Sequence, residues 1–363
     1  MVVPRQRPAG CRHRHGLSDL DRFGFGCVTS LLAGAVLKRL PVLARYGICD
    51  RRAVGGDHHR PVRSGHGNRR DRRADIRVRF DRCRRHEGTS PQSLANEITM
   101  TDFSPILRNK IHKTSSVFTP EALLRESRRQ KGIAAEDVPD VCILDPDGDI
   151  VRYLTSSGKA IRLSTWACYH TDLWVFESGG QPYGIIGCAV GAPFATLIAE
   201  ELFACGCKLL ISMTSAGQIQ PVDTPPYFIV IDHALRDEGT SYHYLPASDF
   251  CCADEALIAS ARDILASTGL PIHFGATWTT DAPFRETEVA IEAAKEAGVL
   301  AVEMEAAALY AFAQAREKPV LCIAHVTNQM GRIDGDFDKG IADGAEDALK
   351  VIGCLGAELI KKG

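Results

Sequence analysis

Two acidic side chains, Glu303 and Glu305, stand at the junction between two apolar segments. Residues 299–302 have the composition of a buried strand, and the Ala-rich stretch that begins at residue 306 has that of a buried helix. The pair is therefore expected where the free N–H groups of a helix N-terminus converge. One interpretation is structural, because a carboxylate there stabilises the helix dipole by up to about 1 kcal/mol. The other is chemical, because a fixed carboxylate can accept hydrogen bonds from the paired hydroxyls of a sugar.

Charge divides the 363-residue chain into two parts. Residues 1–99 carry 20 Arg and one Lys against nine acidic residues, a net charge of +12, whereas the remainder carries 22 basic and 36 acidic residues, a net charge of −14. We expect the first part to be a disordered or non-native Arg-rich extension, with Met100 as the initiator. The alternatives are a nucleic-acid-binding arm, which would carry more aromatic residues, and a transit peptide, which would carry fewer acidic ones.

The 13 cysteines are scattered, and none forms a C-x-x-C pair or a Cys/His cluster with zinc spacing. This pattern favours free thiols in a reducing compartment over a disulfide scaffold or a metal site. No run approaches the roughly 18 apolar residues that a membrane helix needs. We therefore expect a cytoplasmic protein with no metal ion, no membrane partner and no nucleic-acid partner.

After Met100 short apolar runs alternate with helical patterns. Strands are expected at residues 141–144, 184–190, 209–213, 227–231, 299–302 and 320–326, and helices at residues 119–132, 193–204 and 345–361. This alternation predicts an α/β fold in which residues 100–363 form a single-domain, three-layer α/β/α arrangement with a central mixed sheet. Ligand sites in such folds gather at the loops that leave the carboxyl ends of the strands.

Five sequence blocks occur in the order in which a known family has them. They are Gly191-Ala192-Pro193, the stretch from Leu209 to Pro221, the stretch from Arg236 to Pro246, Thr279-Thr280-Asp281 and Glu303-Met304-Glu305. With these blocks residues 100–363 resemble the nucleoside phosphorylase family, and uridine phosphorylases in particular. The resemblance implies a catalytic domain that cleaves the N-glycosidic bond of a nucleoside without a metal or organic cofactor, in a homo-oligomer from dimer to hexamer.

The same resemblance implies roles for residues around the sugar. Glu305 is expected to bind the ribose hydroxyls, Met304 to pack on the sugar, and Ser215 with Gly217 to line the sugar and base pocket. Glu303 and Asp281 belong to the matching blocks and are expected among the substrate-binding residues. The physics agrees, because bond cleavage develops positive charge on the ribose and negative charge on the base. A carboxylate beside the sugar and donors beside the base both favour that transition state.

The base is expected to be a pyrimidine. Asn328 follows an apolar strand and resembles the position that purine-cleaving relatives often fill with Asp. An Asn can donate a hydrogen bond but cannot protonate a purine ring, although an Asn at a strand end is also a common turn former. Phe284 and Arg285 fall where uridine phosphorylases place base-stacking and base-reading side chains, although the Gly-Gln-x-Arg pattern that reads uracil is missing.

The phosphate site departs from the family pattern. Family phosphorylases hold phosphate with a Gly-Asp-Pro-x-x-Arg loop, an Arg ahead of a Gly-Thr-x-Gly turn and commonly an Arg from a neighbouring subunit. In this chain the loop carries Asp145, Asp147 and Asp149, and the other two positions hold Ser212 and a residue near Tyr169.

Three interpretations stay open. A rebuilt phosphate site would use Arg152 or Arg162, and the reaction would then be phosphorolysis of uridine or a related pyrimidine nucleoside to base and ribose 1-phosphate. A nucleosidase would use water, activated by one of the three loop aspartates. A non-catalytic relative would bind nucleosides only. Phosphorolysis is favoured because so many other blocks match.

Overall fold

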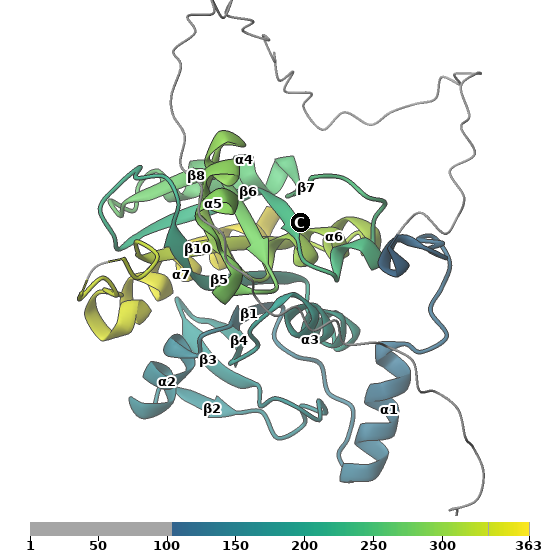
Figure 1. Cartoon of the computed structure of the whole chain (residues 1–363). Coiled ribbons are helices and arrows are strands. Elements are labelled where there is room, and N and C mark those ends of the chain that lie inside the picture. The colour runs from purple at the N-terminus through teal and green to yellow at the C-terminus, as the bar shows by residue number, and fades with distance from the viewer. Residues whose placement is uncertain (1–103, 333, 363) are drawn as a thin grey trace, which may run out of the picture. The chain divides into compact units, whose positions relative to one another are not determined.

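The computed structural model describes residues 104–332 and 334–362, and these form a mixed sheet covered by helices (Figure 1). The expected α/β fold is confirmed. The expectation about residues 1–99 lies outside the described residues.

Ten strands form one mixed sheet in the described part of the chain. They are β1 (Val141–Asp145), β2 (Ala160–Arg162), β3 (Trp174–Ser178), β4 (Gln181–Gly187), β5 (Leu209–Gln218), β6 (Tyr227–Asp237), β7 (Phe250–Cys252), β8 (Ile272–Thr280), β9 (Val299–Glu303) and β10 (Val320–Asn328). The order is β10-β6-β8-β9-β5-β1-β4-β3-β2, and β7 pairs with β6. Because β10 also pairs with β5, the five strands β5, β10, β6, β8 and β9 close on themselves.

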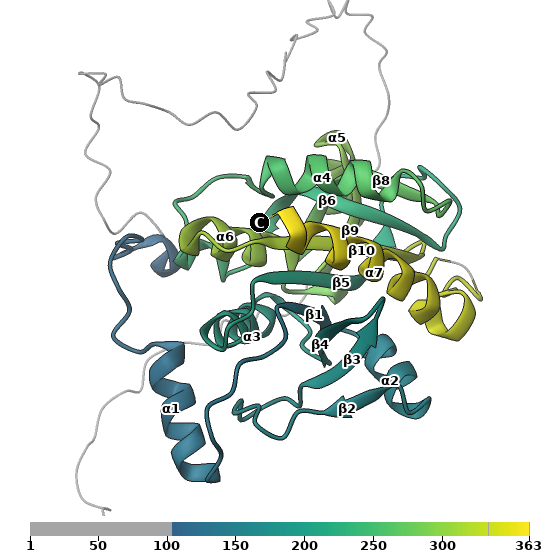
Figure 2. The same ribbon diagram turned by 180° about the vertical axis from the view of Figure 1, so that it is seen from behind.

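Helices cover both faces of this sheet (Figure 2). They are α1 (Pro120–Lys131), α2 (Asp149–Ser156), α3 (Ala192–Ala204), α4 (Glu255–Leu265), α5 (Glu288–Glu296), α6 (Ala306–Arg316) and α7 (Ala345–Lys362), with short 3-10 turns η1 (Pro105–Leu107), η2 (Ser241–His243), η3 (Pro283–Arg285) and η4 (Ile341–Gly344). One apolar core joins α1, α3 and α6 to the sheet, and a second joins α2, α4 and α7 to it. A third, smaller cluster packs α5 against β8 and β9.

The local sequence explains where these elements begin and end. The Thr119 hydroxyl accepts a hydrogen bond from the Ala122 N–H at the start of α1, and Gly132 ends the helix at φ +66°. These are the N-cap and C-cap roles that Thr and Gly favour. Every residue of β1 is buried, as is usual for a parallel strand with helices on both faces.

The parallel arrangement fixes where a ligand site can form. Strands β1, β5 and β10 run parallel to one another, so their carboxyl ends meet at one edge of the sheet. Polar residues continue β5 and β10 beyond their apolar runs and reach that edge.

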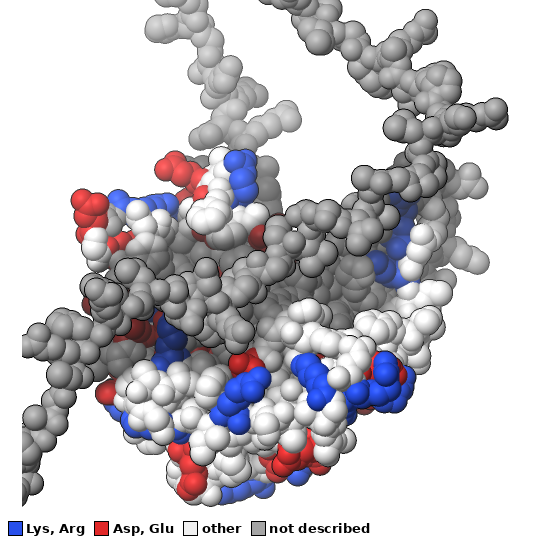
Figure 3. Space-filling view, turned by 90° about the horizontal axis from the view of Figure 1, so that it is seen from below, with Lys and Arg blue, Asp and Glu red and all other residues white. Residues whose placement is uncertain are grey.

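The outer surface offers a contrast to this edge. On the face that carries α1, α2 and β2, acidic and basic side chains are interspersed with uncharged ones (Figure 3). No helix in the described residues is long and apolar enough to span a membrane.

Candidate active site

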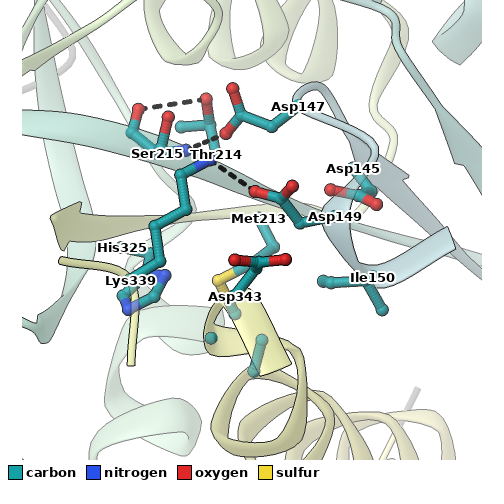
Figure 4. A pocket seen from close by; sticks show the side chains of 12 residues that line it. Asp145, Asp147, Asp149, Ile150, Met213, Thr214, Ser215, His325, Lys339 and Asp343 are labelled. Atoms are coloured by element: carbon teal, nitrogen blue, oxygen red, sulfur yellow. Dashed lines mark hydrogen bonds and ion pairs between the residues drawn. The ribbon is translucent and has the colours of Figure 1, made fainter. Parts of the chain in front are cut away.

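A pocket lies at the carboxyl ends of β1, β5 and β10 (Figure 4). Its wall combines the loop after β1, the end of β5, one residue of β10 and the segment that leads into α7. The lining residues are Asp145, Asp147, Asp149, Ile150, Met213, Thr214, Ser215, His325, Lys339, Asp343, Gly344 and Ala348. Segments almost 200 residues apart in the sequence thus form one wall.

Asp145 and Asp147 have different tasks in the loop after β1. Asp145 is buried and accepts hydrogen bonds from the backbone N–H groups of Gly148 at 3.1 Å and Val151 at 2.9 Å, so it holds the turn into α2. Burial raises the pKa of Asp145 to about 7. Asp147 is half-buried, and its Oδ2 accepts the backbone N–H of Ser215 at 2.9 Å. Asp147 therefore links the β1 loop to the end of β5.

Asp149 is the partner of two cations. Its Oδ1 pairs with Arg152 Nη2, and its Oδ2 pairs with Lys339 Nζ. Figure 4 shows Lys339 reaching across the pocket to this carboxylate. Among the described residues Lys339 is the one ammonium or guanidinium group that lines the pocket, and it is already paired.

His325 occupies the β10 side of the same wall. Its residue exposure is 8%, and its ring stacks on Phe228 with the centroids 4.6 Å apart. Burial and the charge of Lys339 lower the pKa of His325 to about 4, so the ring is neutral at pH 7. Within the described residues neither ring nitrogen has a hydrogen-bond partner. The pocket is therefore lined by a neutral imidazole that has no hydrogen-bond partner in the described part of the protein.

Glu305 lies beside this pocket, at the residue before α6. Its Oε1 accepts the Gly191 N–H at 2.7 Å, and its Oε2 accepts the Thr214 hydroxyl at 2.9 Å and the Met304 N–H at 3.3 Å. The residue is only 1% exposed. Burial, followed by the charge of Glu303, raises the pKa of Glu305 to about 8. In this structure the carboxyl is closed off and largely protonated at pH 7.

Both carboxylate oxygens of Glu303 are hydrogen-bonded within the protein. Its Oε2 accepts the backbone N–H groups of Glu305 and Ala306, both at 2.7 Å, and its Oε1 accepts the hydroxyls of Thr277 and Thr279. These four hydrogen bonds fill the acceptor positions of the carboxylate. In this structure Glu303 therefore caps α6 and ties it to β8, and the expected contact with substrate stays a prediction.

Ser215, Gly217 and Asn328 gather at the same edge. Gly217 pairs with Asn328 on β10 and with Val302 on β9, so the strand ends that carry them meet. A Cβ at Gly217 would lie 2.6 Å from the Met330 Sδ, so the Met330 side chain would have to move to admit it. Asn328 Oδ1 accepts the Met330 N–H at 2.9 Å, as in a turn, while its Nδ2 makes only long contacts of 3.2 and 3.5 Å. Both amide N–H groups therefore have an acceptor, and the 3.5 Å contact to the Ala216 carbonyl is the weaker of the two.

The other expected base-binding residues lie apart from this pocket in the single chain. Phe284 is 99% exposed in η3, and Arg285 beside it is also exposed. Asp281 accepts the Gly239 N–H at 2.8 Å and ties the end of β8 to the loop after β6. None of the three lines the pocket among the described residues.

The two candidate phosphate ligands differ in position. Arg162 lies on the edge strand β2, exposed and paired with Asp172 at 2.7 Å, and is not part of the pocket wall. Arg152 lies close to the loop after β1. Its Nη1 would be 2.9 Å from a Cβ built on Gly148 of that loop. Its guanidinium is paired with Asp149 and exposed at the outer rim. Of the two, Arg152 alone is close to the loop.

Thr214, His325 and Lys339 are site residues that the sequence analysis did not identify. Thr214 directly follows the apolar run of β5, and His325 interrupts the apolar run of β10. A polar residue inside a buried strand is a usable signal, because such a group needs a partner. Lys339 gives no such signal, since it lies in a polar stretch.

Comparison with known proteins matches this architecture to one family. The family model described as the phosphorylase superfamily matches residues 141–358. The uridine phosphorylase of Thermococcus kodakarensis is 26% identical over 234 residues, covering 56% of this chain and 83% of the relative. The DeoD-type purine nucleoside phosphorylase of Colwellia psychrerythraea is 30% identical over 154 residues, covering 42% of this chain and 65% of the relative.

Solved structures share the fold. The purine nucleoside phosphorylase from Toxoplasma gondii in complex with immucillin-H superposes with a TM-score of 0.55 at 20% identity, covering 62% of this chain and 94% of that one. The uridine phosphorylase from Vibrio fischeri complexed with 6-hydroxy-1-naphthoic acid superposes with a TM-score of 0.50 at 21% identity, covering 62% and 91%. At these identities the likeness concerns the fold alone.

Proposed function

The chain belongs to the phosphorylase superfamily, and on that premise we propose that it cleaves the N-glycosidic bond of a nucleoside. The observation that carries the proposal is Glu305, a carboxyl held by Gly191 and Thr214 where β5 and β9 end. A carboxyl so fixed suits a sugar, because it can accept hydrogen bonds from two neighbouring hydroxyls. Relatives named for uridine and for purine nucleosides support the class of substrate.

Access to Glu305 requires a local exchange of hydrogen bonds. Its Oε2 is covered by the Thr214 hydroxyl and the Met304 N–H. A ribose hydroxyl that enters can replace the Thr214 hydroxyl as donor, because both are neutral O–H groups. The half-buried Met304, whose backbone N–H donates to the same carboxyl oxygen, is proposed to pack on the sugar.

The ionised form of Glu305 is the form that stabilises positive charge on the ribose. Because the pKa of this carboxyl is about 8 in the closed structure, activity is expected to increase as the pH rises towards 8. Ribose hydroxyls that donate to the carboxylate would lower its pKa, so substrate binding and proton release are coupled.

For the base we propose a pyrimidine. Asn328 pairs with Gly217, and a ring carbonyl can replace the Ala216 carbonyl, 3.5 Å away, as an acceptor of its Nδ2. A pyrimidine leaving group can spread negative charge onto such carbonyls without being protonated on the ring. Purine cleavage is helped by a proton donor, which an amide does not provide.

A homo-oligomer is part of the proposal. The exposed apolar residues Phe284 and Val289 support a partner surface near η3 and α5. A neighbouring subunit would be needed to bring Phe284 and Arg285 near a base. Light scattering on the purified full chain measures this state, and a monomer would contradict it.

The experiment that tests the function is a substrate panel. Uridine, thymidine, cytidine, inosine and adenosine are each incubated with the full chain, with and without inorganic phosphate, and free base is measured by chromatography. We expect release from the pyrimidine nucleosides. Absence of base release from every nucleoside under both conditions would refute the proposal.

A further inference from the structure

The pocket next to Glu305 is rich in carboxylates and poor in cations. Asp145, Asp147 and Asp149 lie on its wall, and the ammonium of Lys339 is already paired with Asp149. A phosphate dianion needs unpaired N–H donors, preferably arginine forks, and carboxylates repel it. The wall of this pocket therefore opposes phosphate. A neutral nucleophile meets no such repulsion.

Only one of the three loop aspartates has a carboxylate oxygen left over. Both oxygens of Asp145 accept backbone N–H groups, and both oxygens of Asp149 pair with cations. Asp147 uses Oδ2 for the Ser215 N–H, and its Oδ1 has no hydrogen-bond partner among the described residues. Asp147 is therefore the loop carboxylate that can accept a proton.

Asp147 is also linked to Glu305 through neighbouring residues of β5. Asp147 accepts a hydrogen bond from the backbone N–H of Ser215, and the hydroxyl of the adjacent Thr214 donates one to Glu305. The charge of Asp147 contributes to the raised pKa of Glu305, as expected for neighbours in a poorly solvated site. A nucleophile beside Asp147 thus lies next to the place where Glu305 would hold the ribose.

His325 is an independent sign that a small polar ligand belongs in this pocket. The residue is 8% exposed, it lines the pocket, and its ring nitrogens have no partner within the described part of the chain. An imidazole nitrogen that borders a pocket and has no protein partner can form a hydrogen bond with water. Because the pKa of His325 is lowered to about 4, the ring offers a neutral donor and acceptor and adds no positive charge for a phosphate.

We propose that this pocket binds the attacking water, so that the enzyme hydrolyses its nucleoside with Asp147 as the general base. The inference rests on the proposed N-glycosidic cleavage and names its second substrate as water instead of phosphate. The proposal also assigns a role to several polar residues of the pocket wall. Asp147 accepts the proton, His325 holds the water, and Lys339 with Asp149 braces the loop.

The step balances with water as the only co-reactant. The Asp147 carboxylate takes one proton from water while the water oxygen forms a bond to C1′ of the ribose. The C1′–N bond breaks, and its electron pair goes to the base nitrogen. The base then takes one proton from solvent, and Asp147 returns its proton to solvent. The products are free ribose and the neutral base.

Product analysis of the full-length wild-type chain tests the inference without any substitution. Nucleoside is turned over in buffer freed of phosphate and in the same buffer with added inorganic phosphate, and ribose and ribose 1-phosphate are separated by chromatography. We expect equal rates of base release and free ribose in both buffers. Release that requires phosphate and yields ribose 1-phosphate would overturn the water proposal and leave the N-glycosidic cleavage standing. No release in either buffer would overturn both.

A matched pair of variants tests the role of Asp147. Asp147→Asn is expected to lower kcat for hydrolysis by at least about 100-fold, as loss of a general base does, with KM changed only a few-fold. Asp140→Asn is the control, because Asp140 precedes the opposite end of β1 and its exposed carboxylate pairs with Lys208. Its kcat should equal that of the wild type. Hydrolysis by Asp147→Asn at the wild-type rate, with a normal melting temperature, would refute the assignment.

Discussion

Replacing Glu305 by Gln should separate the chemistry of this carboxyl from its packing. Because burial and the charge of Glu303 raise the pKa of Glu305 to about 8, this carboxyl is largely protonated at pH 7 in the free protein. An amide therefore replaces a group of the same shape that is mostly uncharged. The amide oxygen can accept the Gly191 N–H, and the amide nitrogen can donate to the Thr214 hydroxyl. Only the 3.3 Å contact from the Met304 N–H is lost.

The two expected magnitudes differ strongly. Losing one long hydrogen bond costs about 1 kcal/mol, which lowers the melting temperature of a domain of this size by about 2–4 °C. Losing a carboxylate that stabilises the ribose in the transition state costs about 3 kcal/mol, which lowers kcat/KM at least about 100-fold. The loss should be largest at and above pH 8, where the wild-type carboxyl is ionised.

The assay measures base release and thermal unfolding for Glu305→Gln and for a matched control, Glu201→Gln. Glu201 is a carboxyl in α3 that is equally buried and whose pKa burial also raises. The control should keep its activity. If Glu305→Gln retains kcat/KM within tenfold of the wild type at pH 8, Glu305 does not serve the reaction. If both variants lose activity in proportion to stability, the effect belongs to packing and the reasoning fails.

Other predictions follow from the same contacts. Glu303→Gln removes a charge that raises the pKa of Glu305, so the rise of kcat/KM with pH should move to lower pH in a pH profile; an unmoved profile would contradict the coupling. His325 has a pKa of about 4 in the fold and 6.5 ordinarily, so its contribution to stability is present above pH 6.5 and lost towards pH 4. Between pH 7 and pH 5 the unfolding free energy of the wild type should therefore fall by about 2 kcal/mol relative to His325→Gln in denaturant titrations, and parallel curves would refute this. Gly344→Ala should lower the free energy of unfolding by at least about 1 kcal/mol, because Gly344 has φ +80° and its new Cβ would overlap the His325 ring and lie 2.6 Å from the Lys339 carbonyl oxygen; a wild-type melting temperature would show that the neighbouring residues can move aside. Deleting residues 1–99 should leave a soluble, folded and active protein, and aggregation on size-exclusion chromatography would sink the idea of a dispensable extension.

The central strands and principal helices were predictable because buried elements have a regular apolar pattern in the sequence, and a strand buried on both faces is a continuous apolar run. Residues 141–144 and 320–326 are apolar runs, and both became parallel strands in the core. The prediction ended β5 at residue 213 and β6 at residue 231, although they continue to Gln218 and Asp237. Their distal halves carry polar residues that serve the site edge, and apolar periodicity does not detect them. Strands β2, β3, β7 and β8 were missed for a similar reason, since β2, β3 and β7 lie at or near sheet margins and β8 is buried only towards its end.

The composition of the pocket was harder to predict than the fold. The sequence alone identified the loop aspartates, because they occupy the loop in which the family has an arginine. Which of these aspartates is paired with a cation could not be predicted, because Asp149 pairs with Lys339, which lies 190 residues away in the sequence. Sequence spacing carries no information about such a pair. The register of β5 with β10, which brings Ser215 opposite His325, was equally inaccessible without the structure.

Glu303 and Glu305 show why residue type and spacing identify a site before they assign roles within it. Glu303 is the last residue of β9, so its side chain follows the pleat of the strand and meets the hydroxyls of Thr277 and Thr279 on the neighbouring strand β8. Glu305 follows after the strand has ended, at φ −132° and ψ −37°, and turns instead towards Gly191 and Thr214. Two residues of separation thus send chemically identical groups to different neighbours. Glu303 uses two acceptor positions to cap the helix and two to bind hydroxyls of β8, and its charge raises the pKa of Glu305. The structural and the chemical explanations of the motif are therefore not rivals, because we infer that each carboxyl carries one of them.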